Sequence, residues 1–379
     1  MIYLDNAATS FPKPAECLQR GVDEYLRKGF SPGRGGYDAV VEAEERVTGI
    51  RRRLCRFFGA DETYHCCFTY NATEALNLLI QGLIRPGGRV VSSRLEHNAV
   101  LRPLHHLQEE GLIRVDLVPF NDRGFLYPER VAAAIGPDTG LVVVTHASNV
   151  LGTIQPIAAL GQICRERQVP LILDASQSAG AVPLAMKDWG VRGISFTGHK
   201  SLLGPTGIGG LILDPDLHPR PLFFGGTGVD SASLFQTPEF PYRLEAGTIN
   251  LLGILCLDYC LDYLESRLWP LWYDQEMALW EMLREGLLAI PGVHLYGAEH
   301  RHDHLPLLTC TLEGHHADDV GAILDADYGI AVRSGLQCAP LVHQHLGTLE
   351  KGGVRFSLGP FTAESDISAA LEAMARIAR

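Results

Sequence analysis

The stretch LILDASQSAGAVPLAMKDWGVRGISFTGHKSLLGPTGIGGLIL, residues 171–213, contains three apolar runs that predict β-strands. The three runs are Leu171–Asp174, Gly193–Thr197 and Gly207–Leu213. Asp174 ends the first run, and Lys200 lies just after the second. Because ligands of an open α/β sheet bind beyond the carboxyl ends of its strands, we expect these two side chains to share one site.

The same pattern extends over the first two-thirds of the chain. The other strand-like runs are His65–Thr69, Arg89–Ser93, Arg114–Pro119 and Leu141–His146. The helical patterns between the runs are Ala72–Leu83, Asn98–Glu110, Pro128–Ala134 and Ile157–Arg167. This alternation predicts an α/β fold with a mostly parallel sheet of seven strands and helices on both faces. His97 and Asn149 also follow strand ends, so we place them in the same site.

Composition narrows the class of protein. The chain has 379 residues, of which 46% are hydrophobic, enough for a large core and for two domains. A formal net charge of -12 argues against nucleic acid or an anionic membrane as the main partner. No signal peptide is evident, and the apolar stretch Leu251–Leu264 contains Asp258 and Asp262, which indicates a buried helix. Nine scattered cysteines without a CxxC pair indicate reduced thiols and a cytoplasmic location.

The last third of the chain differs in pattern. Residues Pro215–Pro241, rich in glycine and proline, predict a long irregular segment of the kind that is often functional or mobile. A helix-rich segment follows from Leu251. From Pro291 to Arg379, short strands and helices predict a smaller α+β domain.

Lys200 and Asp174 are the residues that indicate a chemistry. A lysine between a strand and a glycine-rich turn can be buried, which lowers its pKa and lets it form a Schiff base with an aldehyde. A carboxylate at position 174 could keep a pyridinium nitrogen protonated. Each has an ordinary alternative, a solvated lysine or an aspartate that caps a helix. The two together favour a pyridoxal phosphate site.

Other residues fit the same cofactor. Gln177 could donate to a phenolic oxygen, and His97 could stack on a ring and move protons. Backbone N–H groups at a helix start can hold a phosphate. Four residues are candidates for that role: Ala72, Thr73, Thr197 and His199. The ordinary alternatives are a helix cap at residue 71 and a structural histidine at 97.

Two residues near the C-terminus are candidates for handling substrate. Cys338 lies in the polar run RSGLQCAP, residues 333–340, which fits an accessible thiol near positive charge. The alternative is a small buried hydrophobe. Arg355 follows two glycines and could hold a carboxylate by two hydrogen bonds, or be a surface charge on an edge strand. His300, His302, His304 and Asp303 cluster without a zinc-site spacing, so we expect no metal.

With these residues in view, the chain resembles the class V aminotransferase family of pyridoxal phosphate enzymes. Within that family it is similar to the cysteine desulfurases, in the branch of SufS-like and selenocysteine lyase-like enzymes. The resemblance runs nearly end to end, from YLDNAAT at residues 3–9 to RSGLQCA at residues 333–339. It departs at Leu336 and Gln337, where the branch usually has two histidines, and this could alter thiol activation or substrate choice.

The resemblance implies a transferase of fold type I that forms a homodimer with the site at the subunit interface. Residues 15–250 would form the large cofactor-binding domain, and residues 1–14 with 251–379 the small domain that carries the cysteine loop. Lys200 would hold the cofactor, Asp174 its ring nitrogen, Gln177 its phenolic oxygen, and His97 would stack on the ring. The phosphate ligands would be Ala72, Thr73, Thr197, His199 and, from the other subunit, Thr248.

The implied reaction is the conversion of L-cysteine to L-alanine. Asn149 and Arg355 would bind substrate, with Asn149 also near the cofactor, and Cys338 would receive the sulfur as a persulfide for a sulfur-acceptor protein. The alternatives are a selenocysteine lyase acting on L-selenocysteine, and another class V reaction such as β-elimination or transamination.

Overall fold

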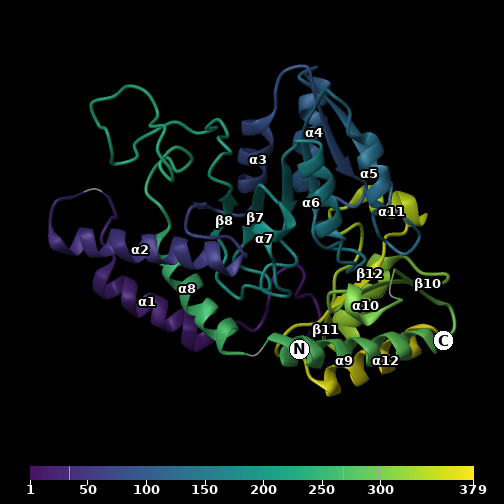
Figure 1. The fold of residues 1–379 in the computed structure, drawn as a ribbon. Coiled ribbons are helices and arrows are strands. Elements are labelled where there is room, and N and C mark those ends of the chain that lie inside the picture. Colours follow the sequence, from purple (N-terminus) through teal and green to yellow (C-terminus); the bar gives the residue numbers. More distant parts are fainter. Residues whose placement is uncertain (34, 268, 298) are drawn as a thin grey trace.

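A sheet of seven strands forms the centre of the molecule (Figure 1). The computed structural model describes residues 1–33, 35–267, 269–297 and 299–379. In their order across the sheet, the strands are β2 (His65–Thr69), β8 (Gly209–Leu213), β7 (Gly193–Thr197), β6 (Leu171–Asp174), β5 (Thr139–Thr145), β3 (Gly88–Ser93) and β4 (Ile113–Val118). Only β8 runs antiparallel to its neighbours in this sheet. The predicted mostly parallel α/β sheet is confirmed.

Helices cover both faces of this sheet because its strands are apolar on both sides. In β5, Leu141 and Val143 point into one core and Val142 and Val144 into the other. Helices α3 (Ala72–Leu83) and α4 (Asn98–Glu109) pack on the first face. The helices with buried residues in the second core include α2 (Asp38–Phe57), α5 (Pro128–Ala134), α6 (Ile157–Glu166), α7 (Met186–Trp189) and α8 (Leu251–Ser266), and α8 also packs against α1 (Ala15–Lys28).

A smaller sheet with its own core lies beside the large one (Figure 1). Its antiparallel strands are β9 (Val293–Tyr296), β10 (Leu307–Leu312) and β12 (Val354–Ser357). The other elements of this part are α9 (Trp269–Leu288), η1 (Arg301–Asp303), α10 (Ala317–Tyr328), α11 (Pro340–Leu346), α12 (Glu364–Ile377) and the parallel pair β1 (Ile2–Tyr3) and β11 (Ile330–Ala331). The predicted α+β character of the C-terminal part is confirmed.

The long segment 214–250 has neither helix nor strand and extends away from the rest of the chain (Figure 1). It contains the segment Pro215–Pro241 that was predicted to be irregular.

Packing of α9 shows where the two cores meet. Trp272 belongs to the core of the large sheet, whereas Met277 and Trp280 belong to that of the small sheet. The division of the chain at residues 14 and 250 stays a prediction, and this packing places the change of core later, within α9.

Gly161 of α6 packs closely against the end of α7. A Cβ at this position would lie 1.7 Å from the carbonyl oxygen of Trp189 at the end of α7. We therefore expect Gly161→Ala to lower the free energy of unfolding by about 2–3 kcal/mol, because backbone must shift to admit the methyl group. Urea unfolding followed by circular dichroism measures this.

The matched control is Gly49→Ala, in the exposed face of α2, where a Cβ would have no neighbour within 4 Å. That change should raise the free energy of unfolding by about 0.5–1 kcal/mol, since alanine has the higher helix propensity. Equal effects from the two substitutions would contradict the close packing of α6 on α7.

Candidate active site

The pairing of three neighbouring strands brings the predicted site residues together. Thr145 of β5 lies opposite Asp174 of β6, which lies opposite Ser195 of β7. At these carboxyl ends lies a hollow with about 690 Å³ of empty space, counting the part open to solvent, which is a size common for ligand pockets. Nine predicted residues line it: Ala72, Thr73, His97, Asn149, Asp174, Gln177, Thr197, His199 and Lys200.

Asp174 has a buried carboxylate whose hydrogen-bond donors all contact one oxygen, Oδ1. It is 4% exposed, and its Oδ1 accepts hydrogen bonds from the backbone N of Ser176 at 2.9 Å and from the hydroxyls of Ser176 and Ser195. These donors satisfy one oxygen of the buried carboxylate. The nearby charge partly offsets the burial of Lys200, yet burial dominates and lowers the pKa of Lys200 to about 8. A larger share of this amine is therefore neutral and nucleophilic at physiological pH.

His97 begins helix α4 and caps it. Its Nδ1 accepts a hydrogen bond of 3.0 Å from the backbone N of Ala99, so the proton of the neutral ring lies on Nε2. Burial, and next the positive charge of Lys200, lower the pKa of His97. The ring is therefore neutral near pH 7 and can donate from Nε2 into the hollow that it lines.

The other end of the hollow offers donors for an anion. Helix α3 begins there, capped by Asn71, whose side chain accepts from the backbone N of Glu74 at 3.0 Å. The first N–H groups of a helix have no partner within it. Within the described chain, the buried atoms Thr197 Oγ1 and His199 Nδ1 also have no hydrogen-bond partner. Since buried polar atoms are normally paired, these orphans indicate a ligand.

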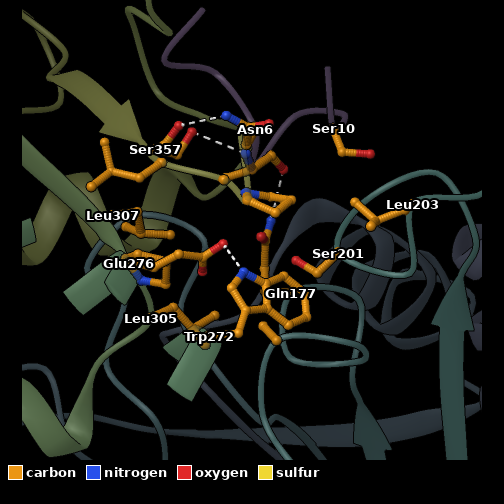
Figure 2. Close-up of a pocket in the computed structure, with 16 residues that line it drawn as sticks. Asn6, Ser10, Gln177, Ser201, Leu203, Trp272, Glu276, Leu305, Leu307 and Ser357 are labelled. Carbon is orange, nitrogen blue, oxygen red and sulfur yellow. Dashed lines mark hydrogen bonds between the residues drawn. The ribbon is translucent and has the colours of Figure 1, made fainter. Parts of the chain in front are cut away.

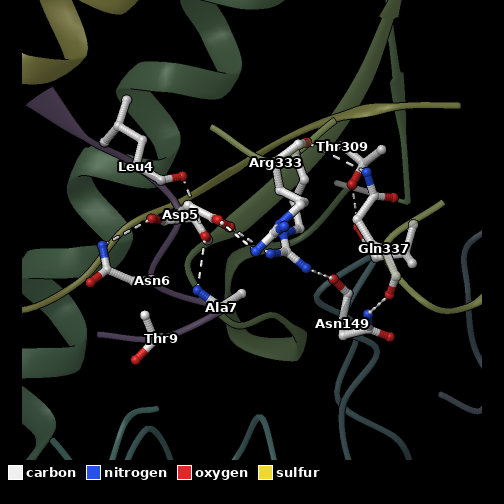
Figure 3. Close-up of polar contacts among 12 residues, drawn as sticks. Leu4, Asp5, Asn6, Ala7, Thr9, Asn149, Thr309, Arg333 and Gln337 are labelled. Atoms are coloured by element: carbon white, nitrogen blue, oxygen red, sulfur yellow. Dashed lines mark hydrogen bonds and ion pairs between the residues drawn. The ribbon is translucent and has the colours of Figure 1, made fainter. Parts of the chain in front are cut away.

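Arg355 is buried inside the molecule, so the alternative of a surface charge does not hold. It is 3% exposed; its Nη2 bonds Asp5 at 2.8 Å and its Nη1 donates to the backbone oxygen of Asn149 at 2.9 Å. Arg333 contacts the other oxygen of Asp5 at 3.2 Å (Figure 3). One carboxylate therefore holds two guanidinium groups, which leaves a net positive charge beside the hollow.

Cys338 differs from the other cysteines. Of the nine, all in the described ranges, eight are buried and only Cys338 is exposed. Its carbonyl oxygen accepts a 2.8 Å hydrogen bond from the backbone N of Asn98, the residue after His97. The thiol loop is thus attached to the wall of the hollow, close enough for a thiolate at 338 to raise the pKa of Lys200.

Three predicted site residues do not line this hollow: Cys338 and Arg355, which lie beside it, and Thr248. Thr248 lines a neighbouring hollow together with Phe223 and Phe224, and Asn71 lines both hollows. Its predicted role in a second subunit stays a prediction.

A small hollow lies behind Gln177 (Figure 2). Gln177 lines both this hollow and the main one, and its Nε2 donates to the backbone oxygen of Ala7 at 3.1 Å. The N-terminal segment thus fixes the side chain of Gln177, which we expect to lie against the cofactor ring.

Glu276 also lines the small hollow. Its carboxylate accepts a 2.7 Å hydrogen bond from Trp272, and burial raises the pKa of Glu276 to about 7.

The sequence of the whole chain fits one family. A family model described as Aminotransferase class-V matches residues 2–370. The chain belongs to the class V aminotransferase family. The resemblance noted in the sequence is confirmed, and the fold matches that of a solved cysteine desulfurase.

Two relatives and one solved structure similar to this chain are named as cysteine desulfurases. A probable cysteine desulfurase of Methanothermobacter thermautotrophicus is 32% identical over 100% of this chain and 94% of the relative. A cysteine desulfurase of Pectobacterium atrosepticum is 30% identical over 100% of this chain and 93% of the relative. The apo structure of a cysteine desulfurase from Thermococcus onnurineus superposes with a TM-score of 0.92 at 31% identity, covering 100% of this chain and 94% of that one.

Three features of the site of this class V family member were not predicted. Asp5 lies within the quoted run YLDNAAT, yet nothing local indicates that it holds Arg355. Gln337 and His343 bond each other beneath the cysteine loop. Glu96 is fully buried beside Asp174, where its position next to His97 was the only signal.

Two kinds of feature, a metal-binding cluster and a membrane-spanning helix, are absent from the described residues. In ranges 1–33, 35–267, 269–297 and 299–379, no group of three or more histidine, cysteine, aspartate or glutamate side chains is arranged to hold a metal ion. In the same ranges, no helix has the length and apolar character needed to cross a membrane.

Glu96 makes stability depend on pH. Its Oε1 accepts from Thr145 N at 3.0 Å and from the Ser93 hydroxyl, while its buried Oε2 has no partner in the described chain. Burial raises the pKa of Glu96 to about 8. The folded protein therefore favours the neutral acid, whose stabilisation is complete below the unfolded pKa of about 4.3 and is lost as pH rises toward 8.

The test is Glu96→Gln, a neutral side chain of the same shape. Between pH 5 and 8, the free energy of unfolding of the unmodified protein should fall relative to that of the variant, by at most about 1.4 kcal/mol per pH unit. Urea unfolding at each pH measures the difference. A difference that stays constant with pH would show that Glu96 is ionised throughout. Glu45→Gln, at an exposed position of α2, is the control for other pH effects.

Proposed function

We propose that this protein is a pyridoxal phosphate-dependent cysteine desulfurase that converts L-cysteine to L-alanine and keeps the sulfur as a persulfide on Cys338. The observation that carries the proposal is the exposed thiol of Cys338, attached through Asn98 to a hollow that contains Lys200 and Asp174. The names of the relatives support the same activity.

The residues of the hollow fit the cofactor. Lys200 is a buried amine of lowered pKa, Asp174 a buried carboxylate at the strand end, and Thr197 and His199 present unpaired polar atoms near the start of α3. They would hold the aldehyde carbon, the ring nitrogen and the phosphate in that order. When bound, pyridoxal phosphate supplies an electron sink that weakens the bonds at the α-carbon of an amino acid.

Arg355 and Asn149 would bind the substrate carboxylate. The Nε of Arg355 is buried and has no hydrogen-bond partner in the described chain. Asp5 and the Asn149 carbonyl occupy its two terminal nitrogens and fix the plane of the guanidinium. A fixed plane aims the remaining N–H groups at one place, which favours a carboxylate over a neutral group.

Two groups can handle protons beside the substrate. Lys200, with its pKa lowered to about 8, can take a proton at Nζ and return it within the working pH range. His97 carries a proton on Nε2 and stays neutral because burial lowers its pKa. The two groups thus divide the work, Lys200 as the base and His97 as a neutral hydrogen-bond donor.

Cys338 would take the sulfur atom. Its thiolate attacks the sulfur of the substrate, an S–S bond forms, and the carbon–sulfur bond breaks with its electron pair moving to the carbon. A proton added to that carbon gives alanine, so L-cysteine and the enzyme thiol yield L-alanine and the enzyme persulfide. The exposed position of Cys338 lets a second molecule, such as a sulfur-acceptor protein, reach the persulfide.

A homodimer would complete the site. The segment 214–250 exposes Phe223, Phe224, Leu234 and Phe235, which is the pattern of an interface. Thr248 in the same segment lines a hollow that adjoins the cofactor hollow through Asn71, and could meet the phosphate bound by a second copy.

The cysteines, none of them in a disulfide, support a reducing compartment such as the cytoplasm.

Lys200→Ala tests the cofactor. The unmodified protein, incubated with pyridoxal phosphate and dialysed, should keep a visible absorption band, and the variant should lose it because the amine that bonds the aldehyde is gone. Lys187→Ala, an exposed lysine on α7, is the matched control and should keep the band. If the unmodified protein shows no visible absorption band after this treatment, the cofactor assignment is wrong.

Cys338→Ala tests the sulfur transfer. We expect alanine formation from L-cysteine to fall by at least about a hundredfold, because the nucleophile is removed, while the visible absorption stays. Cys17→Ala, in α1, is the control and should keep full activity. Unchanged alanine formation would exclude a persulfide on Cys338, and pyruvate in place of alanine would indicate β-elimination.

A further inference from the structure

Gln337, the residue before the thiol, has a fully bonded side chain inside the protein. It is 7% exposed, and its Nε2 donates to the backbone oxygen of Gly353 at 2.8 Å. That bond fixes which end of the amide faces His343, so Oε1 is the atom that accepts from His343 Nε2, at 2.6 Å. A side chain in a loop is therefore bonded both to the small sheet and to α11.

His343 completes the arrangement as a neutral ring. It is fully buried, and burial lowers its pKa to about 4. Because its Nε2 donates to Gln337, its Nδ1 is unprotonated and accepts the hydroxyl of Thr348 at 2.8 Å. We call Gln337, His343 and Thr348 the amide clamp. Every polar atom of the Gln337 amide and of the His343 ring has a hydrogen-bond partner, and neither group is charged at neutral pH.

The backbone above the amide clamp is strained. Gln337 and Cys338 have φ angles of 43° and 58°, two consecutive residues in the left-handed region without a glycine. Such residues persist only where their surroundings hold them. Besides the clamp, Asn149 Nδ2 donates to the carbonyl oxygen of Gln337 at 2.6 Å, and Asn98 N donates to that of Cys338 at 2.8 Å.

These contacts connect the thiol to the rest of the site. Asn98 follows His97, and Asn149 bonds both Gln337 and, through its own carbonyl, Arg355 (Figure 3). The backbone bonds explain where the loop is attached.

A third backbone bond, from Ala339 N to the carbonyl oxygen of Leu336 at 2.9 Å, closes a tight turn with Gln337 and Cys338 at its two central positions. A turn with positive φ at both central positions favours glycine, asparagine or aspartate, so other contacts must hold these two residues in it. The buried side chain of Gln337 makes such contacts.

We propose that Gln337 is a positioning residue, which acts through the amide clamp to hold Cys338 in the left-handed conformation that aims its thiol at the bound substrate. The proposal rests on the proposed function, since it concerns the transfer of sulfur to Cys338. The adjacent Leu336 is half-buried, and its side chain takes no part in the clamp.

The clamp predicts a separation of two reactivities. Transfer of sulfur from a fixed substrate depends on where the thiol points, and displacement of a reacting atom by about 1 Å can cost a hundredfold in rate. Alkylation of the same exposed thiol by free iodoacetamide needs no fixed direction. Loss of the clamp should therefore slow sulfur transfer and leave alkylation almost unchanged, whereas general unfolding of the loop would alter both.

The main variant is Gln337→Met, which keeps the length of the side chain and removes its hydrogen bonds. Gln337→Ala serves as the second variant if methionine does not fold, and Leu336→Ala is the matched control. Three quantities are measured on the full chain: kcat and KM for L-cysteine with the cofactor-loaded enzyme, the rate of iodoacetamide alkylation of Cys338, and hydrogen exchange at the Asn98 amide, which needs no substrate.

For Gln337→Met we expect kcat to fall about tenfold or more with KM and the alkylation rate within about twofold, and Asn98 exchange to rise about tenfold or more. Leu336→Ala should match the unmodified protein in all three. Thr348→Val, which removes the far end of the clamp, should add little to the effect of Gln337→Met, because residues that act as one unit are not additive.

Two results would overturn the proposal: Asn98 exchange unchanged in Gln337→Met, or effects of Gln337→Met and Thr348→Val that add in full. An unmodified enzyme that forms no alanine from L-cysteine would instead refute the proposed function. The exchange measurement would still decide whether the clamp holds the loop.

Discussion

The register of three parallel strands determines where the chemistry of this molecule takes place. Hydrogen bonds between β5, β6 and β7 align Thr145, Asp174 and Ser195 at one edge of the sheet. A slip by one residue would turn Asp174 to the opposite face. Polar contacts at the strand ends oppose the slip, since Thr145 N donates to Glu96 Oε1 at 3.0 Å and the Ser195 hydroxyl donates to Asp174 Oδ1 at 3.4 Å. The position of the charged group thus depends on these hydrogen bonds together with the apolar packing on both faces of the sheet.

The second constraint is the carboxylate of Asp5, which joins parts of the chain that are distant in sequence. It follows β1, contacts Arg355 of β12 and Arg333 before the cysteine loop, and Arg355 in turn bonds the carbonyl of Asn149 after β5 (Figure 3). A buried charge of this kind is costly unless it is paired and fully bonded. The pair of arginines around one acid therefore connects the small sheet to the large one and leaves a net positive charge beside the hollow.

Sequence reasoning succeeded where the signals are local. Helices Ala72–Leu83 and Pro128–Ala134 have the predicted bounds, because Asn71 caps the first and Pro128 opens the second. The two-residue strands β1 and β11 are too short to show a period, and they were not predicted. The contact of Asp5 with Arg355 spans 350 residues, and no local pattern can indicate it. Nine of the 14 residues that line the hollow were predicted, because they lie at or just after strand ends.

Gln337 shows why a single position can be recognised as unusual and still not be understood from sequence. In the sequence it was a departure, an amide where a histidine is usual. In the structure its meaning comes from His343, a neutral partner with its pKa near 4, and from the strained backbone that both support. In the proposed reaction Lys200, whose pKa burial lowers to about 8, is the group that gains and loses a proton. A support that stays neutral while Lys200 changes charge keeps the thiol in one place through that change.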